Sequence, residues 1–135
     1  MKHKGNTFEF MRERNRDLWR AYRTQLATMK FIEAQRLMTN TVAMPARRFY
    51  VSEERARKVI NAMLRGDDIR HMKSTSRRMF KEIYRRVMAA KYRQPHLSTH
   101  QIIIRVIYEE APEFYITPQS AAVIISKIRT GKYPI

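Results

Sequence analysis

The residues of this chain whose types and spacing could support chemistry are mainly arginines and lysines that recur every three or four positions. Between residues 70 and 105 there are ten basic residues and a single acid, Glu82, which leaves a formal charge of +9. A guanidinium group can donate two parallel hydrogen bonds to phosphate oxygens, so a row of them on one helix face suits a run of phosphates. The candidate phosphate-binding residues here are Arg77, Arg78, Lys81, Arg85 and Arg86.

A second basic row lies near the N-terminus, where the cations again fall on one face at the period of a helix. They span an arc of about 80° opposite an apolar stripe. The acids Glu9, Glu13 and Asp17 are close in sequence, so a solvated face held by i,i+4 ion pairs is an equally good interpretation. The residues of this row are Arg12, Arg16, Arg20, Arg23 and Lys30.

Two helix–connector–helix pairs invite comparison with the helix-turn-helix of DNA-binding proteins, whose second helix enters the major groove. Arginine pairs well with guanine, and asparagine or glutamine with adenine. The connector 110–116 is longer than the three or four residues of that motif, so the comparison is one of topology only. The residues that would contact bases are Arg55, Lys58, Asn61 and Arg65 in the first pair and Gln119, Ser120, Lys127 and Thr130 in the second.

Two aromatic pairs, Phe49-Tyr50 and Phe114-Tyr115, could stack on unpaired bases, as aromatic side chains do in single-strand binders. Aromatic residues just before a helix N-cap more often pack on the core and fix how the chain enters the helix. Their occurrence at the same place in two similar segments favours this structural role.

Groups that could support catalysis are few. Asp67, Asp68 and His71 could form a small metal site, but acids after a helix C-terminus are more often turn residues. His96 and His100 lack the intervening glutamate of a zinc-protease helix. The chain has no cysteine, no phosphate-binding P-loop and no G-x-G-x-x-G. We therefore expect no enzyme, no metal and no cofactor.

The charge of the whole chain indicates an acidic partner. With 28 Lys and Arg against 12 Asp and Glu, the net charge is +16, and nucleic acid is the commonest partner of such proteins because phosphate contacts release counterions. We expect binding to nucleic acid, to double-stranded DNA rather than RNA, mainly through the phosphate backbone. The alternative is a structural or adaptor subunit that docks on an acidic protein or within a nucleoprotein assembly.

The N-terminus has no secretion signal and no apolar stretch long enough to span a membrane, so we expect a soluble, cytoplasmic protein with no membrane contact.

The elements that must position these residues are helices. Glycine occurs three times and proline five, and the apolar residues recur at helical spacing. We predict an all-α fold of about five helices in one domain, 1–135, with a long N-terminal helix. Their expected extents, with N-caps in parentheses, are about 8–38 (Asn6 or Thr7), 53–65 (Ser52), 75–91 (Ser74 or Thr75), 99–109 (Ser98) and 118–130 (Thr117). Gly66 and Gly131 follow the second and the fifth of these segments and are the glycines expected to end them.

An internal similarity suggests two related helix–connector–helix units. The segment FYVSEERARKVINAMLRG, which begins at Phe49, aligns without gaps to FYITPQSAAVIISKIRTG, which begins at Phe114, with five identical positions of 18. We predict a duplication, with repeat 1 at about 31–66 and repeat 2 at about 96–131. Any two capped amphipathic helices share some of this pattern. The Ile-rich fourth and fifth helices could also form a homo-oligomer contact, for which Val123, partly off the apolar stripe, is the clue.

Overall fold

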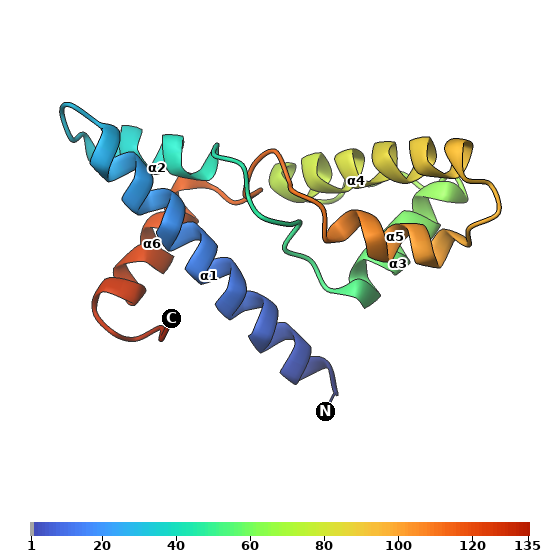
Figure 1. The fold of residues 1–135 in the computed structure, drawn as a ribbon, viewed down its shortest axis with the longest axis horizontal. Coiled ribbons are helices and arrows are strands. Elements are labelled where there is room, and N and C mark those ends of the chain that lie inside the picture. Colours follow the sequence, from blue (N-terminus) through green and yellow to red (C-terminus); the bar gives the residue numbers. More distant parts are fainter. Residues whose placement is uncertain (1) are drawn as a thin grey trace. The chain divides into compact units, whose positions relative to one another are not determined.

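The computed structural model of the chain is helical throughout, as the sequence predicts. It describes residues 2–135, with side chains from residue 10 onward, and within these residues it contains six helices and no strand (Figure 1). The helices are α1 (Lys2–Thr28), α2 (Ala34–Val42), α3 (Glu53–Leu64), α4 (Ser74–Arg93), α5 (Thr99–Ile107) and α6 (Pro118–Arg129).

The sixth helix arises because the single helix predicted for 8–38 is two helices. The chain leaves α1 at Thr28 and starts α2 at Ala34, and α2 continues to Val42, past residue 38 where the single helix was expected to end. The break carries no glycine or proline that would mark it in the sequence. It exists because α2 folds back to pack on α1, which buries Leu37 and leaves Phe31 84% exposed.

Three of the predicted N-caps are confirmed. The side chains of Ser52, Ser98 and Thr117 each accept a hydrogen bond from the backbone N–H three residues later. Ser98 and Gln101 complete a capping box. These caps satisfy amide groups that a helix N-terminus otherwise leaves without a partner.

The caps predicted for the first and the third segments are wrong. Since α1 begins at Lys2, Asn6 and Thr7 lie within that helix. The N-cap of α4 is Lys73, whose side chain makes no capping hydrogen bond, while Ser74 is already helical and Thr75 is buried. The two predicted glycine stops are present, with Gly66 at φ +97° and Gly131 at φ +81°, the left-handed conformation that glycine adopts at low cost.

The described residues form two compact units. Unit 1 contains α1, α2 and α6 and consists of the described residues up to Tyr50 together with Glu110–Ile135. Its three helices pack on one another, and its two connectors meet where Ala46 and Ala111 exchange two backbone hydrogen bonds of 2.9 Å. The fully buried residues at its centre include Leu18, Ala21, Phe49 and Ala121.

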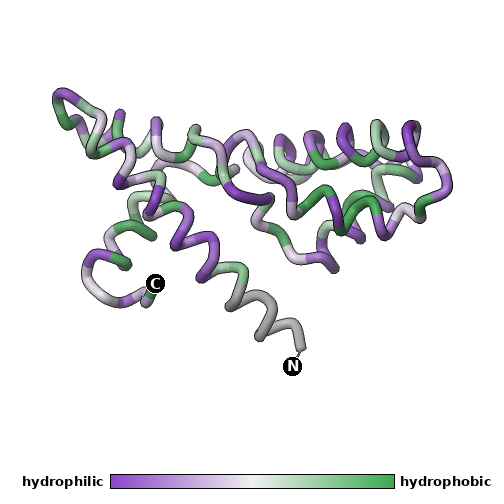
Figure 2. The backbone as a smooth tube through the Cα atoms, viewed as in Figure 1, coloured by the Kyte–Doolittle hydropathy of each residue, from purple (hydrophilic) through white to green (hydrophobic). Residues whose placement is uncertain are grey.

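Unit 2 is Val51–Glu109 and contains α3, α4 and α5, each of which packs on the other two. Its core is apolar, and α5 is its most hydrophobic helix, as the colouring of Figure 2 shows. The fully buried residues of this core include Ile60, Phe80, Ile83, Val87, Ile102, Ile103 and Ile107.

The helices of the two units are related by one shift along the sequence. The difference in residue number between Phe49 and Phe114 is called here the sequence offset. Added to the first and last residue numbers of α2, it gives those of α5, and added to those of α3, it gives those of α6. It carries Thr28, the end of α1, onto Arg93, the end of α4. Unit 1 thus combines the first two helices of the chain with the last one, and unit 2 combines the third with the fourth and fifth.

Candidate nucleic-acid interface

The outward face of α4 carries the densest row of cations predicted from the sequence. Residues Met79, Phe80, Ile83 and Val87 are buried and fix the orientation of this helix in unit 2. Exposed side chains follow on the other side at spacings of four and three residues, which is the spacing of one helix face. They are Ser74, Arg78, Lys81, Arg85, Met88 and Tyr92. The row is therefore presented to solvent along most of the helix.

The only acid of this helix, Glu82, is held by two arginines. It accepts hydrogen bonds from Arg85 at 3.0 and 2.7 Å and from Arg86 at 2.8 Å. The hydrogen bond from Arg85 is the main reason that the pKa of Glu82 falls from 4.5 to about 2. The Arg86 side chain also donates to Glu109 at 3.2 Å and is half-buried. Arg86 thus belongs to an ion-pair cluster within unit 2, whereas Arg85 stays mostly exposed.

The remaining members of the row differ in their own contacts. Arg77 is half-buried and donates to the backbone oxygen of Arg70 at 3.1 Å, so it braces the start of α4. Arg78 donates to the Ser74 hydroxyl at 3.2 Å and is exposed. Lys81 is exposed at the middle of the face. Arg78, Lys81 and Arg85 are consequently the three cations of this surface that an anion can reach most directly.

Sequence analysis missed the apolar end of the same face. Tyr92 is 90% exposed and Met88 is 43% exposed, four residues apart and in line with Arg85. Their helical spacing from Lys81 was visible in the sequence, but tyrosine and methionine are usually assigned to the core. They extend the basic row with an apolar contact surface.

The row predicted on α1 is only partly a free surface. Arg12, Arg16 and Arg23 are exposed. Arg20 is half-buried and donates to Asp17 and, at 3.2 Å, to the backbone oxygen of Pro45. Lys30 lies beyond the end of α1 and is not part of the row.

Asp17 is a buried anchor in unit 1, with its side chain only 1% exposed. Besides Arg20, it accepts hydrogen bonds from the Tyr50 hydroxyl and the Arg47 backbone N–H, both at 2.7 Å. Burial, together with these contacts to Asp17, raises the pKa of Tyr50. The sequence placed Asp17 among surface acids. The partners that bury it, Arg47 and Tyr50, lie 30 and 33 residues away, so no local pattern marked its burial.

The candidate base-contacting residues of α3 make contacts within unit 2. The guanidinium of Arg55 lies over the Phe80 ring, 5.3 Å from its centroid. Lys58 forms an exposed ion pair with Glu54 at 3.9 Å, and Asn61 is half-buried. In unit 1, Lys127 of α6 lies over the Tyr133 ring, while Gln119, Ser120 and Thr130 are exposed on the same helix or at its end.

The two aromatic pairs lie in the core of unit 1. Phe49 stacks on Tyr115 with ring centroids 6.0 Å apart, and Tyr50 stacks on Phe114 at 6.3 Å. Phe49, Phe114 and Tyr115 are buried and Tyr50 is half-buried, which leaves these rings little surface for a base. The pairs thus occupy the structural role that sequence analysis favoured.

The two acids considered for a metal site pair with arginines. Asp67 forms an ion pair with Arg65 at 3.8 Å, and Asp68 bonds both the backbone and the guanidinium of Arg70. These bonds to Arg70 lower the pKa of Asp68. Within the described residues, no three His, Cys, Asp or Glu side chains gather in a way that could hold a metal ion.

The apolar residues considered for an oligomer contact have different positions. Ile102, Ile103 and Ile107 of α5 lie in the core of unit 2, whereas Val123 of α6 is 55% exposed in unit 1. In the part of the chain that the structure describes, no helix combines the length and the apolar character needed to cross a membrane.

Comparison with known proteins gives no family. The chain matches no family model, no curated protein and no solved structure. The geometry of its own residues is therefore the basis for a functional assignment.

Proposed function

We propose that this protein is a non-catalytic nucleic-acid-binding protein that binds double-stranded DNA mainly through phosphate contacts. The outward face of α4 carries the proposal, because Arg78, Lys81 and Arg85 lie in line on it and are exposed. The one acid of the helix is already shared between two arginines, so it does not neutralise the whole row. The net charge of +16 supplies a favourable long-range field for the same ligand.

The dimensions of a helix fit this ligand. From Arg78 to Arg85 the axis of α4 rises about 10 Å, a length over which one DNA strand presents about three phosphates. The major groove of B-form DNA is about 12 Å wide and admits a helix, whereas that of A-form RNA is too deep and narrow for side chains to read. These dimensions support duplex DNA over duplex RNA.

We also propose that the chain is an internal duplication, which would supply a second basic helix of the same kind. The common sequence offset of the helix ends supports it, and so does the pairing of Ala46 with Ala111. The offset also relates an arrangement in α1 to one in α4: Asp17 accepts from Arg20, and Glu82 accepts from Arg85. At this offset Arg12 matches Arg77, and Arg16 matches Lys81. The α1 row would then be a second, weaker phosphate-binding face.

The proposal is tested by titrating the protein against labelled duplex DNA, single-stranded DNA and duplex RNA over a series of salt concentrations. We expect duplex DNA to bind most tightly and log affinity to fall steeply with log salt. Arg78→Ala and Lys81→Ala should each weaken binding to all sequences alike and reduce the salt slope by about one.

The matched control is Lys132→Ala, which removes one exposed positive charge from unit 1 outside both rows. It should change the affinity little. If both α4 variants bind as the wild type does, the surface is wrong. If no nucleic acid binds below about 10 μM at low salt, where even non-specific binders are tight, the function is wrong. An acidic protein partner then becomes the better hypothesis.

A further inference from the structure

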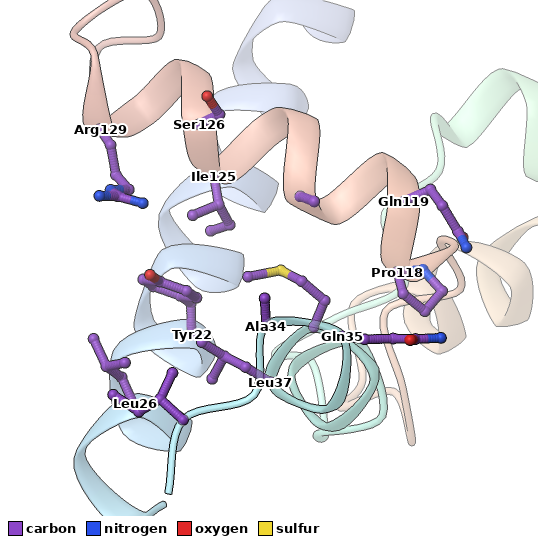
Figure 3. Close-up of a pocket in the computed structure, with 13 residues that line it drawn as sticks. Tyr22, Leu26, Ala34, Gln35, Leu37, Pro118, Gln119, Ile125, Ser126 and Arg129 are labelled. Carbon is purple, nitrogen blue, oxygen red and sulfur yellow. The ribbon is translucent and has the colours of Figure 1, made fainter.

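Unit 1 contains an open apolar groove between α1, α2 and α6 that the proposed function does not use. Its volume is about 480 Å³. Figure 3 shows side chains from all three helices converging on it. The lining residues that matter most are Tyr22, Leu26, Leu37, Met38, Ala122 and Ile125. A groove of this size and character binds apolar groups by removing their surface from water.

The one charged side chain and the two amide side chains of the groove lie at its ends. Arg129 is at one end, while Gln35 and Gln119 are at the other, as Figure 3 shows. Arg129 is the only charged residue in the lining, which contains no acid, and it is exposed. An occupant that places a carboxylate beside this guanidinium would gain a charge-assisted hydrogen bond.

The apolar surface continues beyond the groove. Ile32, which lines it, is 65% exposed, and its neighbour Phe31 is 84% exposed. Two large apolar side chains in a row on the short α1–α2 connector add a contact area that a small molecule inside the groove would leave uncovered. This extent favours a macromolecular occupant.

The positions of unit 2 that correspond to this groove by the sequence offset are filled differently. Lys91 stands where unit 1 has Leu26, and it donates to Thr99 at 2.9 Å. Ile103 is fully buried where Met38 is only half-buried. Leu64 replaces Arg129. The open groove with a cation at its end is thus a property of unit 1 and does not follow from the helix arrangement that the two units share.

We propose that this groove docks an amphipathic helix of a partner protein that carries acidic residues beside its apolar stripe. Helices bind such grooves through apolar residues at i, i+3, i+4 and i+7. The lysines and arginines near the lining, Lys30, Arg36 and Arg129, outnumber the one nearby acid, Glu33. A second copy of this chain would bring another +16 to the same place, so charge favours an acidic partner over self-association.

The single tryptophan of the chain provides the measurement. Trp19 stacks on Tyr22, with ring centroids 5.4 Å apart, and Tyr22 lines the groove. The probe is a synthetic helical peptide of about 18 residues with leucines at i, i+3, i+4 and i+7 and glutamates on its other faces. Two matched peptides accompany it, one with lysine in place of glutamate and one with the same composition in scrambled order.

We expect the acidic amphipathic peptide to change the Trp19 fluorescence saturably and to bind at least about tenfold more tightly than either matched peptide. Ala122→Leu fills the groove and should weaken binding about tenfold. Its control is Ala27→Leu, the same change at an exposed position of α1 outside the lining. Arg129→Glu should weaken binding more than Lys132→Glu, which alters the net charge equally.

The variant Ile32→Ser tests the groove without disturbing the fold, because Ile32 is mostly exposed and its replacement leaves the core intact. It should also weaken peptide binding. Equal binding of the scrambled peptide, or unchanged binding in both Ala122→Leu and Ile32→Ser, would overturn the proposal. A concentration-dependent dimer that Ala122→Leu abolishes would overturn it in favour of a second copy. DNA affinity should be the same in Ala122→Leu and Ile32→Ser, which leave the charge unchanged, so the two proposals fail independently.

Discussion

One carboxylate in each unit organises the arginines around it. Asp17 and Glu82 each accept hydrogen bonds from the arginine three residues later. Asp17 also fixes the 45–50 connector through Tyr50 and the Arg47 backbone, whereas Glu82 joins Arg85 and Arg86 on the flank of α4. The donors around Glu82 favour its ionised form, so its pKa lies below the usual value. These two acids therefore allow a strongly basic chain to place arginines close together.

Replacing Glu82 should change how stability depends on pH. Its folded pKa of about 2 lies below the value of 4.5 expected in the unfolded chain. A depressed pKa stabilises the fold above pH 4.5, and this contribution is lost as the pH falls towards 2. Because Arg85 is 68% exposed and solvent screens its ion pair with Glu82, the shift corresponds to about 1 to 2 kcal/mol. Urea unfolding should show Glu82→Gln less stable than wild type at pH 7, with the difference shrinking between pH 5 and pH 2.

The control for this comparison is Glu33→Gln, an exposed acid that caps α2 without a side-chain hydrogen bond. Its stability should follow that of the wild type at every pH. A difference between Glu82→Gln and wild type that stays constant from pH 7 to pH 2 would contradict the role assigned to this carboxylate.

At the scale of the elements, local signals define where three of the six described helices start. Ser52, Ser98 and Thr117 occupy N-caps and make the capping bond, whereas Ser74 is the first residue of α4 and caps nothing. The start of α4 is held instead by Arg77, which donates to the backbone oxygen of Arg70, and by the buried Thr75. Serine before an apolar run is thus a good but incomplete guide.

The cap assignments predict a graded set of stability changes. Ser52→Ala, Ser98→Ala and Thr117→Ala should each lower the free energy of unfolding by about 1 kcal/mol, because each leaves a helix N–H without its partner. Ser74→Ala should cost less than about 0.5 kcal/mol, since it removes only an exposed hydrogen bond from Arg78. Chemical denaturation of the four variants measures this order. A cost for Ser74→Ala equal to the others would contradict the observed start of α4.

At the scale of the whole molecule, each unit contains helices from both halves of the sequence. The last helix, α6, packs on α1 and α2, while α3 packs on α4 and α5. Ile125 of α6 and Ile60 of α3 are buried in the respective cores. The first half of the sequence therefore supplies α3 to the core of unit 2, and the second half supplies α6 to the core of unit 1. Each half needs the other to complete its core.

A cut between the halves should leave the protein assembled. A protease site inserted between the exposed residues Asp67 and Asp68 would separate α1–α3 from α4–α6 in the covalent chain. After cleavage we expect the two fragments to co-elute on gel filtration and to separate only in denaturant, because separation exposes both apolar cores. Two separate peaks in native buffer would show that the packing of α3 and α6 is not as described.

The sequence by itself determined the all-helical class, the capping residues of three helices, the two glycine stops and the position of the basic rows. These features depend on neighbours within one or two helical turns, so periodicity and side-chain type are sufficient to predict them. The outward direction of Arg78, Lys81 and Arg85 follows from the same periodicity, given the apolar residues between them.

Only the tertiary structure decided the rest. It breaks the first predicted helix at residues 29–33, where no breaker residue stands, because α2 gains more by packing back on α1 than by continuing it. It buries Asp17 and removes Arg20 and Arg86 from the free basic surface through contacts with other segments. It also opens the groove of unit 1. Each of these outcomes depends on residues distant in sequence, whose meeting no local pattern encodes.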